Sequence, residues 1–213
     1  SAAKLTGKTA GGWSLNLVDA VTAREHADEA FGPIHRRTEV EPPTNYLATR
    51  VRRDVGQRAG FGMIATAVNR GLDDSALASQ LASDAYVAGI DGHLFLNAKR
   101  DWVVTSGLSG SHVSGTPAAI LRLQRSSARY CQRPDASHLS LNPSATSMDG
   151  WNVQADLNKE SGKFRPNVSA WAVSPGYEVN DLGFQTNADR RGTHAALFWR
   201  DPDLHRFTRN REL

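Results

Sequence analysis

The sequence contains very little cysteine and no long apolar run, and each absence excludes a class of protein. One cysteine, Cys131, among 213 residues excludes an internal disulfide and a metal cage built from cysteines. No apolar run reaches the roughly 18 residues that a membrane-spanning helix needs. The mean hydropathy of −0.46 is typical of a water-soluble protein. A barrel strand, however, needs apolar residues only at alternate positions, so membrane strands are not excluded.

A strong excess of one charge is also missing. Lys and Arg number 25 against 22 Asp and Glu, which gives a net charge of +3. The arginines stand in separate pairs, such as Arg36-Arg37 and Arg190-Arg191, and form no basic stripe with interleaved aromatics. We therefore expect no nucleic-acid partner. The sequence also lacks a signal peptide and begins at Ser1 without an initiator Met, so we expect it to be cut from a longer protein.

What the sequence does contain is alternation of apolar and polar residues, the pattern of a strand with two different faces. The clearest example is Trp151–Asn158, where every odd-numbered residue is apolar and every even-numbered one is polar. Nine strands are expected, at residues 4–9, 13–17, 45–52, 61–68, 85–96, 102–113, 151–158, 164–173 and 193–200. Residues 207–213 could begin a tenth.

The connections between these strands alternate in length. Short turns are expected at 10–12, 54–60, 97–101, 159–162 and 201–203, and long segments at 22–44, 70–83, 114–149 and 174–187. Short periplasmic turns and long external loops are typical of outer-membrane barrels. The sequence therefore predicts an all-β fold in one domain, residues 1–213. This fold is an antiparallel up-and-down meander that resembles an outer-membrane barrel or an open fragment of one. Short helices are expected in two long segments, at 74–84 and 117–130.

The aromatic residues fit the same interpretation. Those near the short turns are Trp13, Phe61, Trp102, Phe164 and Trp199, and those near the opposite strand ends are Tyr46 and Trp151. Aromatic girdles at both interfaces are typical of membrane barrels, although aromatics also favour strands in general. In such a barrel we expect the lumen to be lined by Arg50, Arg52, Asn152, Gln154 and Asp156. Lipid would contact Leu15, Leu17, Trp151, Val153, Ala155 and Leu157.

Three stretches resemble a known family: Lys4–Trp13, Gln124–Tyr130 and, most specifically, Ser174–Gln185. Over nearly its whole length the chain resembles the C-terminal region of a family of large bacterial proteins of unknown function. In that family a domain similar to carbohydrate-binding module family nine precedes a predicted outer-membrane barrel. The resemblance implies a barrel segment in the outer membrane with a glycan-associated role, and it transfers no catalytic residue to this chain.

Two loop carboxylates are the candidates for catalysis. A glycosidase needs two carboxylates about 5–10 Å apart across the sugar. Glu178 and Asp181 lie in the most distinctive stretch and are the pair to test first. The same residues, followed by Gly183, also fit ordinary turn chemistry.

A second group of loop residues is the candidate for ligand binding. Arg122, Arg125 and Arg129 would follow one face of the expected helix and could meet lipopolysaccharide phosphates or an acidic glycan. A solvated helix face is the simpler interpretation. Tyr130 and Tyr177 are loop aromatics that could stack on sugars.

Other catalytic and metal motifs are missing. The seven histidines include no pair at metal-ligand spacing. Ser109, Ser111 and His112 do not form a nucleophile elbow, which requires glycine at position 111. We expect no metal and no cofactor.

Two functions remain open. The first is a segment of a bacterial outer-membrane barrel with a structural, channel or surface glycan-associated role. Its partners would be lipid, glycan or lipopolysaccharide, and other copies through open sheet edges. The alternative is a secreted or periplasmic soluble all-β protein, either a glycoside hydrolase or a glycan-binding module, which uses loops 114–149 and 174–187.

Overall fold

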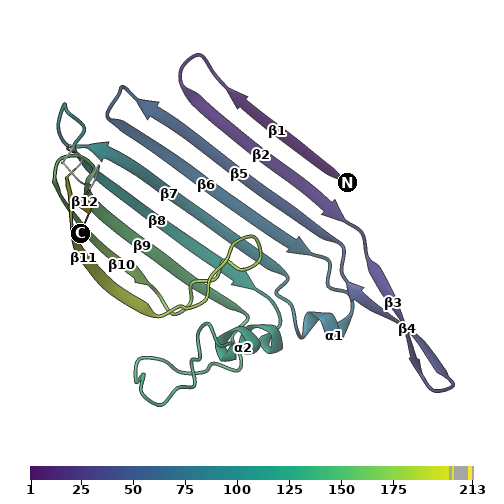
Figure 1. Ribbon diagram of the computed structural model, residues 1–213. Coiled ribbons are helices and arrows are strands. Elements are labelled where there is room, and N and C mark those ends of the chain that lie inside the picture. Colours follow the sequence, from purple (N-terminus) through teal and green to yellow (C-terminus); the bar gives the residue numbers. More distant parts are fainter. Residues whose placement is uncertain (202, 204–210, 213) are drawn as a thin grey trace.

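The computed structural model describes residues 1–201, 203 and 211–212. Most of the chain forms one antiparallel sheet in which strands pair in chain order (Figure 1). Its strands are β1 (Ala2–Lys8), β2 (Trp13–Thr22), β5 (Thr44–Val55), β6 (Ala59–Arg70), β7 (Asp84–Phe95), β8 (Trp102–Ser114), β9 (Ser147–Lys159), β10 (Phe164–Val173), β11 (Arg190–Asp201) and β12 (Arg211–Glu212). The predicted all-β meander is confirmed, and each predicted strand corresponds to one of β1, β2 and β5–β11. Within the described part of the chain the sheet is open, with β1 and β12 at its edges.

The expected tenth strand can be assessed only in part. Of residues 207–213, the structure describes Arg211 and Glu212, which pair with Asp201 and Arg200 of β11. Residues 207–210 and 213 lie outside the described residues, as does Pro202 of the turn expected there.

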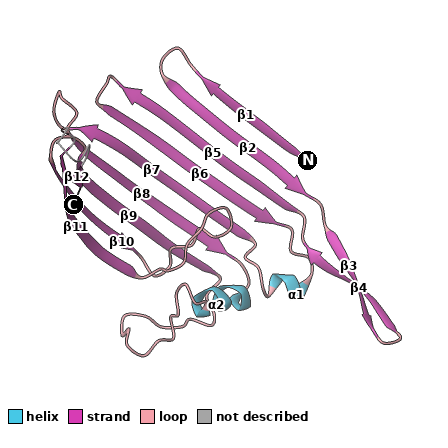
Figure 2. Cartoon of the chain, in the orientation of Figure 1, coloured by secondary structure: helices cyan, strands magenta, loops and turns pink. Residues whose placement is uncertain are grey.

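Short turns and long segments alternate between the two ends of the sheet, as predicted (Figure 2). The turn expected at 54–60 is tighter than predicted because both of its strands extend further into it. β5 continues to Val55 and β6 starts at Ala59, so only three residues separate them. Gly56 in this turn has φ +60°, a left-handed conformation that glycine adopts without steric cost.

The segment 22–44 is not a plain loop, which corrects the prediction. It contains a hairpin of β3 (Glu25–Phe31) and β4 (Ile34–Glu41) that projects beyond the main sheet (Figure 1). Gly32 turns the chain with φ +61°. Alternation did not reveal these strands because charged residues occupy positions on both of their faces.

Both helices are shorter than predicted. α1 (Ser75–Ala78) starts where the Asp74 carboxylate accepts a hydrogen bond from the Ala76 backbone N–H at 2.8 Å. α2 (Pro117–Arg125) ends where Ser126 turns to extended backbone, with ψ 154°. No helix in the described residues is long and apolar enough to cross a membrane.

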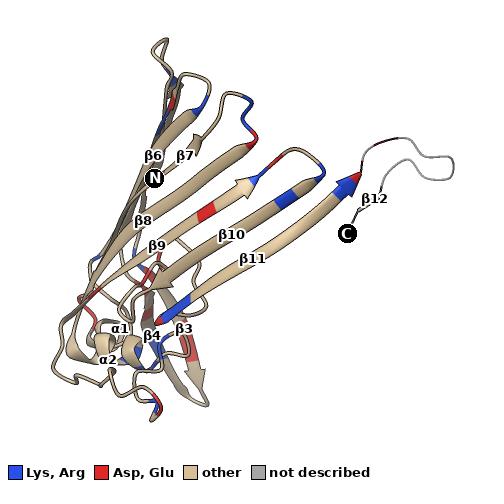
Figure 3. Ribbon diagram, turned by 90° about the vertical axis from the view of Figure 1, so that its left-hand side faces the viewer, with Lys and Arg blue, Asp and Glu red and all other residues tan. Residues whose placement is uncertain are grey.

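The sheet is curved, and β10 and β11 come forward of the other strands (Figures 1 and 3). A small core lies on the concave face near the long loops. It packs Val68, Ala85 and Val113 of the sheet against Ile120 of α2, which is fully buried. Tyr46 packs against this core. The prediction that Tyr46 belongs to an aromatic girdle is therefore wrong, because this ring is on the concave face.

Candidate functional site

The two faces of the sheet differ in chemistry. Paired residues in neighbouring strands point to the same side, and side chains alternate along each strand. The ladder register thus places the expected lumen residues on the concave face and the expected lipid-facing residues on the convex face, as the alternation predicted. Trp151, on the convex face, is 48% exposed and does not lie in a buried core. Figure 3 shows charged residues at several strand ends and in the connections, and also within β9 and β10.

On the convex face, one row of paired apolar residues crosses six adjacent strands. It consists of Leu15, Val51, Met63, Ile90, Leu108 and Val153. Met63, Ile90 and Leu108 are at least half exposed.

Aromatic residues bound the same face at the end of the short turns. By register these are Trp13, Phe61, Trp102, Phe164 and Trp199. The rings of Trp13 and Phe61 meet edge to face with centroids 5.7 Å apart. At the opposite end, Tyr86 stacks on His112, followed by polar residues such as Asn69 and Asp84.

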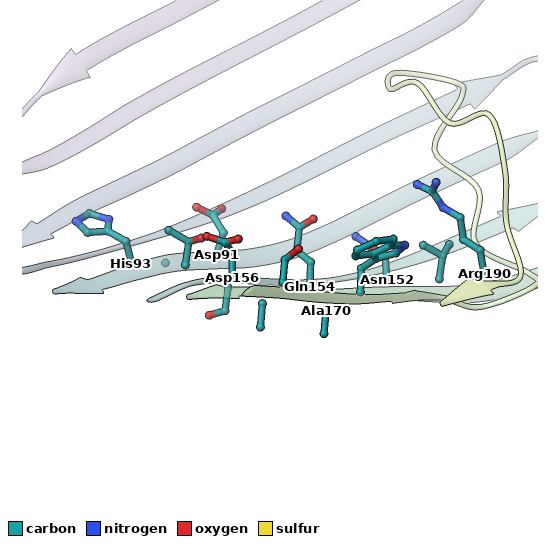
Figure 4. A pocket seen from close by; sticks show the side chains of 14 residues that line it. Asp91, His93, Asn152, Gln154, Asp156, Ala170 and Arg190 are labelled. Atoms are coloured by element: carbon teal, nitrogen blue, oxygen red, sulfur yellow. The ribbon is translucent and has the colours of Figure 1, made fainter. Parts of the chain in front are cut away.

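The concave face carries a groove of about 810 Å³ between β7 and β11. Its polar lining comes from three neighbouring rows of the sheet, and Figure 4 shows several of these side chains pointing to the same side. The lining residues that present polar or aromatic side chains on the concave face are Asp91, His93, Thr105, Asn152, Gln154, Asp156, Ser169, Trp171 and Arg190. Sequence reasoning anticipated Asn152, Gln154 and Asp156 but missed Trp171. The signal for Trp171 was its place in the alternation of β10, on the same face as the polar residues Asn167 and Ser169.

One carboxylate of the groove is already neutralised. Arg50 forms a two-point ion pair with Asp91, in which Nη2 lies 2.7 Å from Oδ1. The arginine reaches from β5 across Gly62 of β6, where a Cβ would lie 2.5 Å from the guanidinium. Glycine at this position therefore leaves room for the ion pair to lie against the sheet.

The segment 174–187 folds onto the concave face instead of extending away from it. The Tyr177 hydroxyl shares a hydrogen bond of 2.6 Å with Ser109 Oγ, and the Glu178 N–H donates to Ser111 Oγ at 2.9 Å. The backbone of this segment runs so close to β9 that a Cβ on Gly150 would overlap the Tyr177 backbone. The two serines that do not fit a nucleophile elbow are thus anchor points for this loop.

The two catalytic candidates, Glu178 and Asp181, each pair with a different arginine. Glu178 is 2.5 Å from Arg129, and both side chains are almost completely buried, at 3% and 1% exposure. Arg129 also donates to the Tyr177 carbonyl at 2.6 Å. Asp181 is 2.6 Å from Arg70. The hypothesis of a glycosidase pair gains no support from this geometry.

The prediction that three arginines share one exposed helix face is wrong for Arg129. Arg122 and Arg125 are exposed on α2, but Arg129 lies beyond the end of the helix and is buried against Glu178. Tyr130 is exposed, whereas Tyr177 is 8% exposed and is occupied by its contact with Ser109. The structure thus brings Arg129, Tyr177 and Glu178 together and leaves Arg122, Arg125 and Tyr130 at the surface.

Among the described side chains, no group of three His, Cys, Asp or Glu is placed to hold a metal ion. Cys131 is buried in the segment after α2, and burial raises the pKa of its thiol. A thiol with a raised pKa is a poor nucleophile at neutral pH.

An open, curved antiparallel sheet with one polar and one apolar face defines the architecture. The chain belongs to the family described as a domain of unknown function (DUF5916), whose model matches residues 1–203. No curated protein and no solved structure matches the chain significantly. The sequence resemblance to an uncharacterised family is confirmed to this extent.

Proposed function

We propose that residues 1–213 form one unit in the wall of a bacterial outer-membrane β-barrel, with no catalytic role of their own. The convex face contacts lipid and the concave face lines a polar lumen. The observation that carries this proposal is the exposed apolar row of the convex face, from Leu15 to Val153. Contiguous apolar surface of this kind is unusual in water and marks a membrane or protein contact.

The dimensions and borders of the convex face support the same function. β5–β9 contain 12 or 13 residues each, enough for the roughly 9–11 that cross a bilayer when tilted. Aromatics bound the apolar band at the turn end, where membrane barrels place them at the interface. The long segments, including α2 and the β3–β4 hairpin, are then external, and the short turns are periplasmic.

The segment 174–187 gives the proposed lumen a fixed constriction at its external end. The buried pair of Arg129 and Glu178 and the hydrogen bonds to Ser109 and Ser111 hold it against the concave face. A loop fixed in this way narrows the path along the sheet, as inserted loops do in other barrels. The role is therefore structural or channel-like, and glycan or lipopolysaccharide would contact the outer segments.

Cysteine labelling along β9 tests the proposal. Cys131→Ser removes the single native thiol, and one cysteine is then placed at Val153 or Ala155 on the convex face, or at Gln154 or Asp156 on the concave face. The protein is then spin-labelled in bacterial outer membranes. We expect labels at 153 and 155 to be accessible to oxygen and shielded from a water-soluble nickel complex. Labels at 154 and 156 should show the reverse.

The competing proposal, a soluble carbohydrate-active enzyme or glycan-binding module, gives a different result. A soluble protein would be recovered without membranes, and the nickel complex would reach the exposed convex positions. Either result would refute the membrane function.

A further inference from the structure

We propose that the concave groove binds a neutral saccharide whose apolar face stacks on the indole of Trp171. This inference rests on the proposed function in one respect: it takes the concave face as the lumen. It adds the class of ligand that this lumen binds. The groove volume of about 810 Å³ lies within the roughly 300–1,000 Å³ of typical ligand sites.

Trp171 is placed as a flat platform. Its neighbours across the ladder are Gln154 on β9 and Gly192 on β11. A Cβ on Gly192 would lie 2.5 Å from the indole, so the ring occupies the space that a side chain would fill there. The indole thus covers the β11 backbone with one side and forms part of the groove wall. Saccharide rings have apolar C–H faces, which pack on large aromatic surfaces of this kind.

Hydrogen-bonding groups surround this platform. Gln154 is directly beside Trp171, and Asn152 and Asp156 are two residues away on the same face of β9. Within the described part of the chain, the amides of Asn152 and Gln154 take part in no hydrogen bond. Asp156 accepts one bond, from Asn167 Nδ2 at 2.9 Å. Amides both donate and accept, and a carboxylate accepts, which matches the mixed donor and acceptor character of sugar hydroxyls.

The charges favour a neutral ligand over an ionic one. Asp91 is paired with Arg50, so the remaining full charges of the lining are Asp156 and Arg190, and the groove carries no excess of either sign. Figure 4 shows Arg190 at one end of the groove and His93 at the other, with Asn152, Gln154 and Asp156 between them. Asp156 would repel an anionic sugar, and Arg190 would repel an organic cation. A neutral sugar experiences neither repulsion.

Titration calorimetry tests this site. The protein is held in a zwitterionic detergent without a sugar headgroup and titrated with cellopentaose, maltopentaose and chitopentaose. Choline and tri-galacturonate serve as charged probes. We expect at least one neutral oligosaccharide to bind, Trp171→Ala to weaken its affinity at least tenfold, and Trp171→Phe to stay within about threefold. Gln154→Ala is a second variant that should weaken binding without removing the platform.

Trp151→Ala is the matched control, because it removes an indole from the opposite face of the adjacent strand. It should leave saccharide affinity unchanged. The inference is overturned if none of the neutral probes binds, if a charged probe binds more tightly, or if Trp171→Ala and Gln154→Ala both bind like the native protein. The labelling pattern of β9 does not depend on this ligand, so failure of the saccharide site is distinguishable from failure of the membrane proposal.

Discussion

At the scale of single residues, the pairing of Arg129 and Glu178 is the most consequential contact. Both side chains are almost completely buried, and burying charges costs free energy that only good geometry repays. The arginine also bonds the Tyr177 carbonyl, so one guanidinium holds two consecutive residues of segment 174–187. We interpret the pair as the lock that fixes this segment on the concave face.

Glu178→Gln would leave the Arg129 guanidinium buried without its counter-charge. Breaking a buried pair in this way costs about 3–5 kcal/mol, and the loss should appear locally. We expect backbone amides of 174–187 to exchange hydrogen much faster while those of β6 and β7 stay protected. Asp181→Asn is the control, because its pair with Arg70 is more exposed, at 20% and 12%, and we expect a smaller effect. Equal protection in both variants would contradict the role of Arg129 and Glu178 as a lock.

At the scale of elements, the short turns are linked to each other as well as to their own strands. Asp101, which ends the turn between β7 and β8, accepts a hydrogen bond from the Ser161 hydroxyl in the turn between β9 and β10. This bond lowers the pKa of Asp101 below its ordinary value. A lowered carboxyl pKa means that the contact stabilises the fold at pH values above the ordinary value, about 3.9, and is lost as the pH falls through the lowered pKa.

Ser161→Ala should therefore raise the pKa of Asp101 toward its ordinary value. A titration of the Asp101 carboxyl carbon by NMR between about pH 2 and pH 6 measures the change. Ser127→Ala, in an exposed position at the loop end of the molecule, should leave the titration unchanged. An unaltered Asp101 pKa in Ser161→Ala would show that the hydroxyl is not the cause.

At the scale of the whole molecule, the open edge at β1 exposes backbone N–H and C=O groups that have no partner strand in the described part of the chain. Hydrogen bonds to β2 involve odd-numbered residues of this end of the chain, as the Ser1–Val21 and Thr9–Trp13 bonds show. The backbone groups of even-numbered residues, such as Lys4 and Thr6, consequently point away from β2. Within the described residues no strand pairs with them. In lipid such groups require a partner, because each unsatisfied one costs several kcal/mol.

We expect the isolated chain in detergent to self-associate through this edge. Lys4→Pro and Thr6→Pro remove outward N–H groups without removing a bond to β2, and they should shift the protein toward monomer in light scattering after size exclusion. Leu5→Pro is the contrasting variant, because its N–H points to β2 and its loss should fray β1 instead. Oligomers that persist in Lys4→Pro and Thr6→Pro would place the contact elsewhere.

Much of this architecture is determined by the sequence itself. Alternation places Val153 and Gln154 on opposite faces wherever the strand lies, because the side-chain period of a strand is two. Gly-containing turns and the contrast between short and long connections determine which strands are neighbours. The nine strands of the meander could therefore be predicted, together with the faces of β5 and β9. The hairpin β3–β4 could not, because its strands carry charge on both faces and bury no apolar side.

Tertiary structure alone decided the sites. The sequence predicts Arg129 as one of three arginines on a helix face. In the structure α2 ends at Arg125, and Arg129 points inward to Glu178, which lies 49 residues later in the sequence. From the sequence, Trp171 is one of several aromatic residues in strands. Only the pairing of β10 with β9 and β11 places it beside Gln154 and over Gly192. Local periodicity determines which way a side chain points. What it meets there depends on curvature and on loops that fold back across the sheet, and these are long-range contacts that no local pattern encodes.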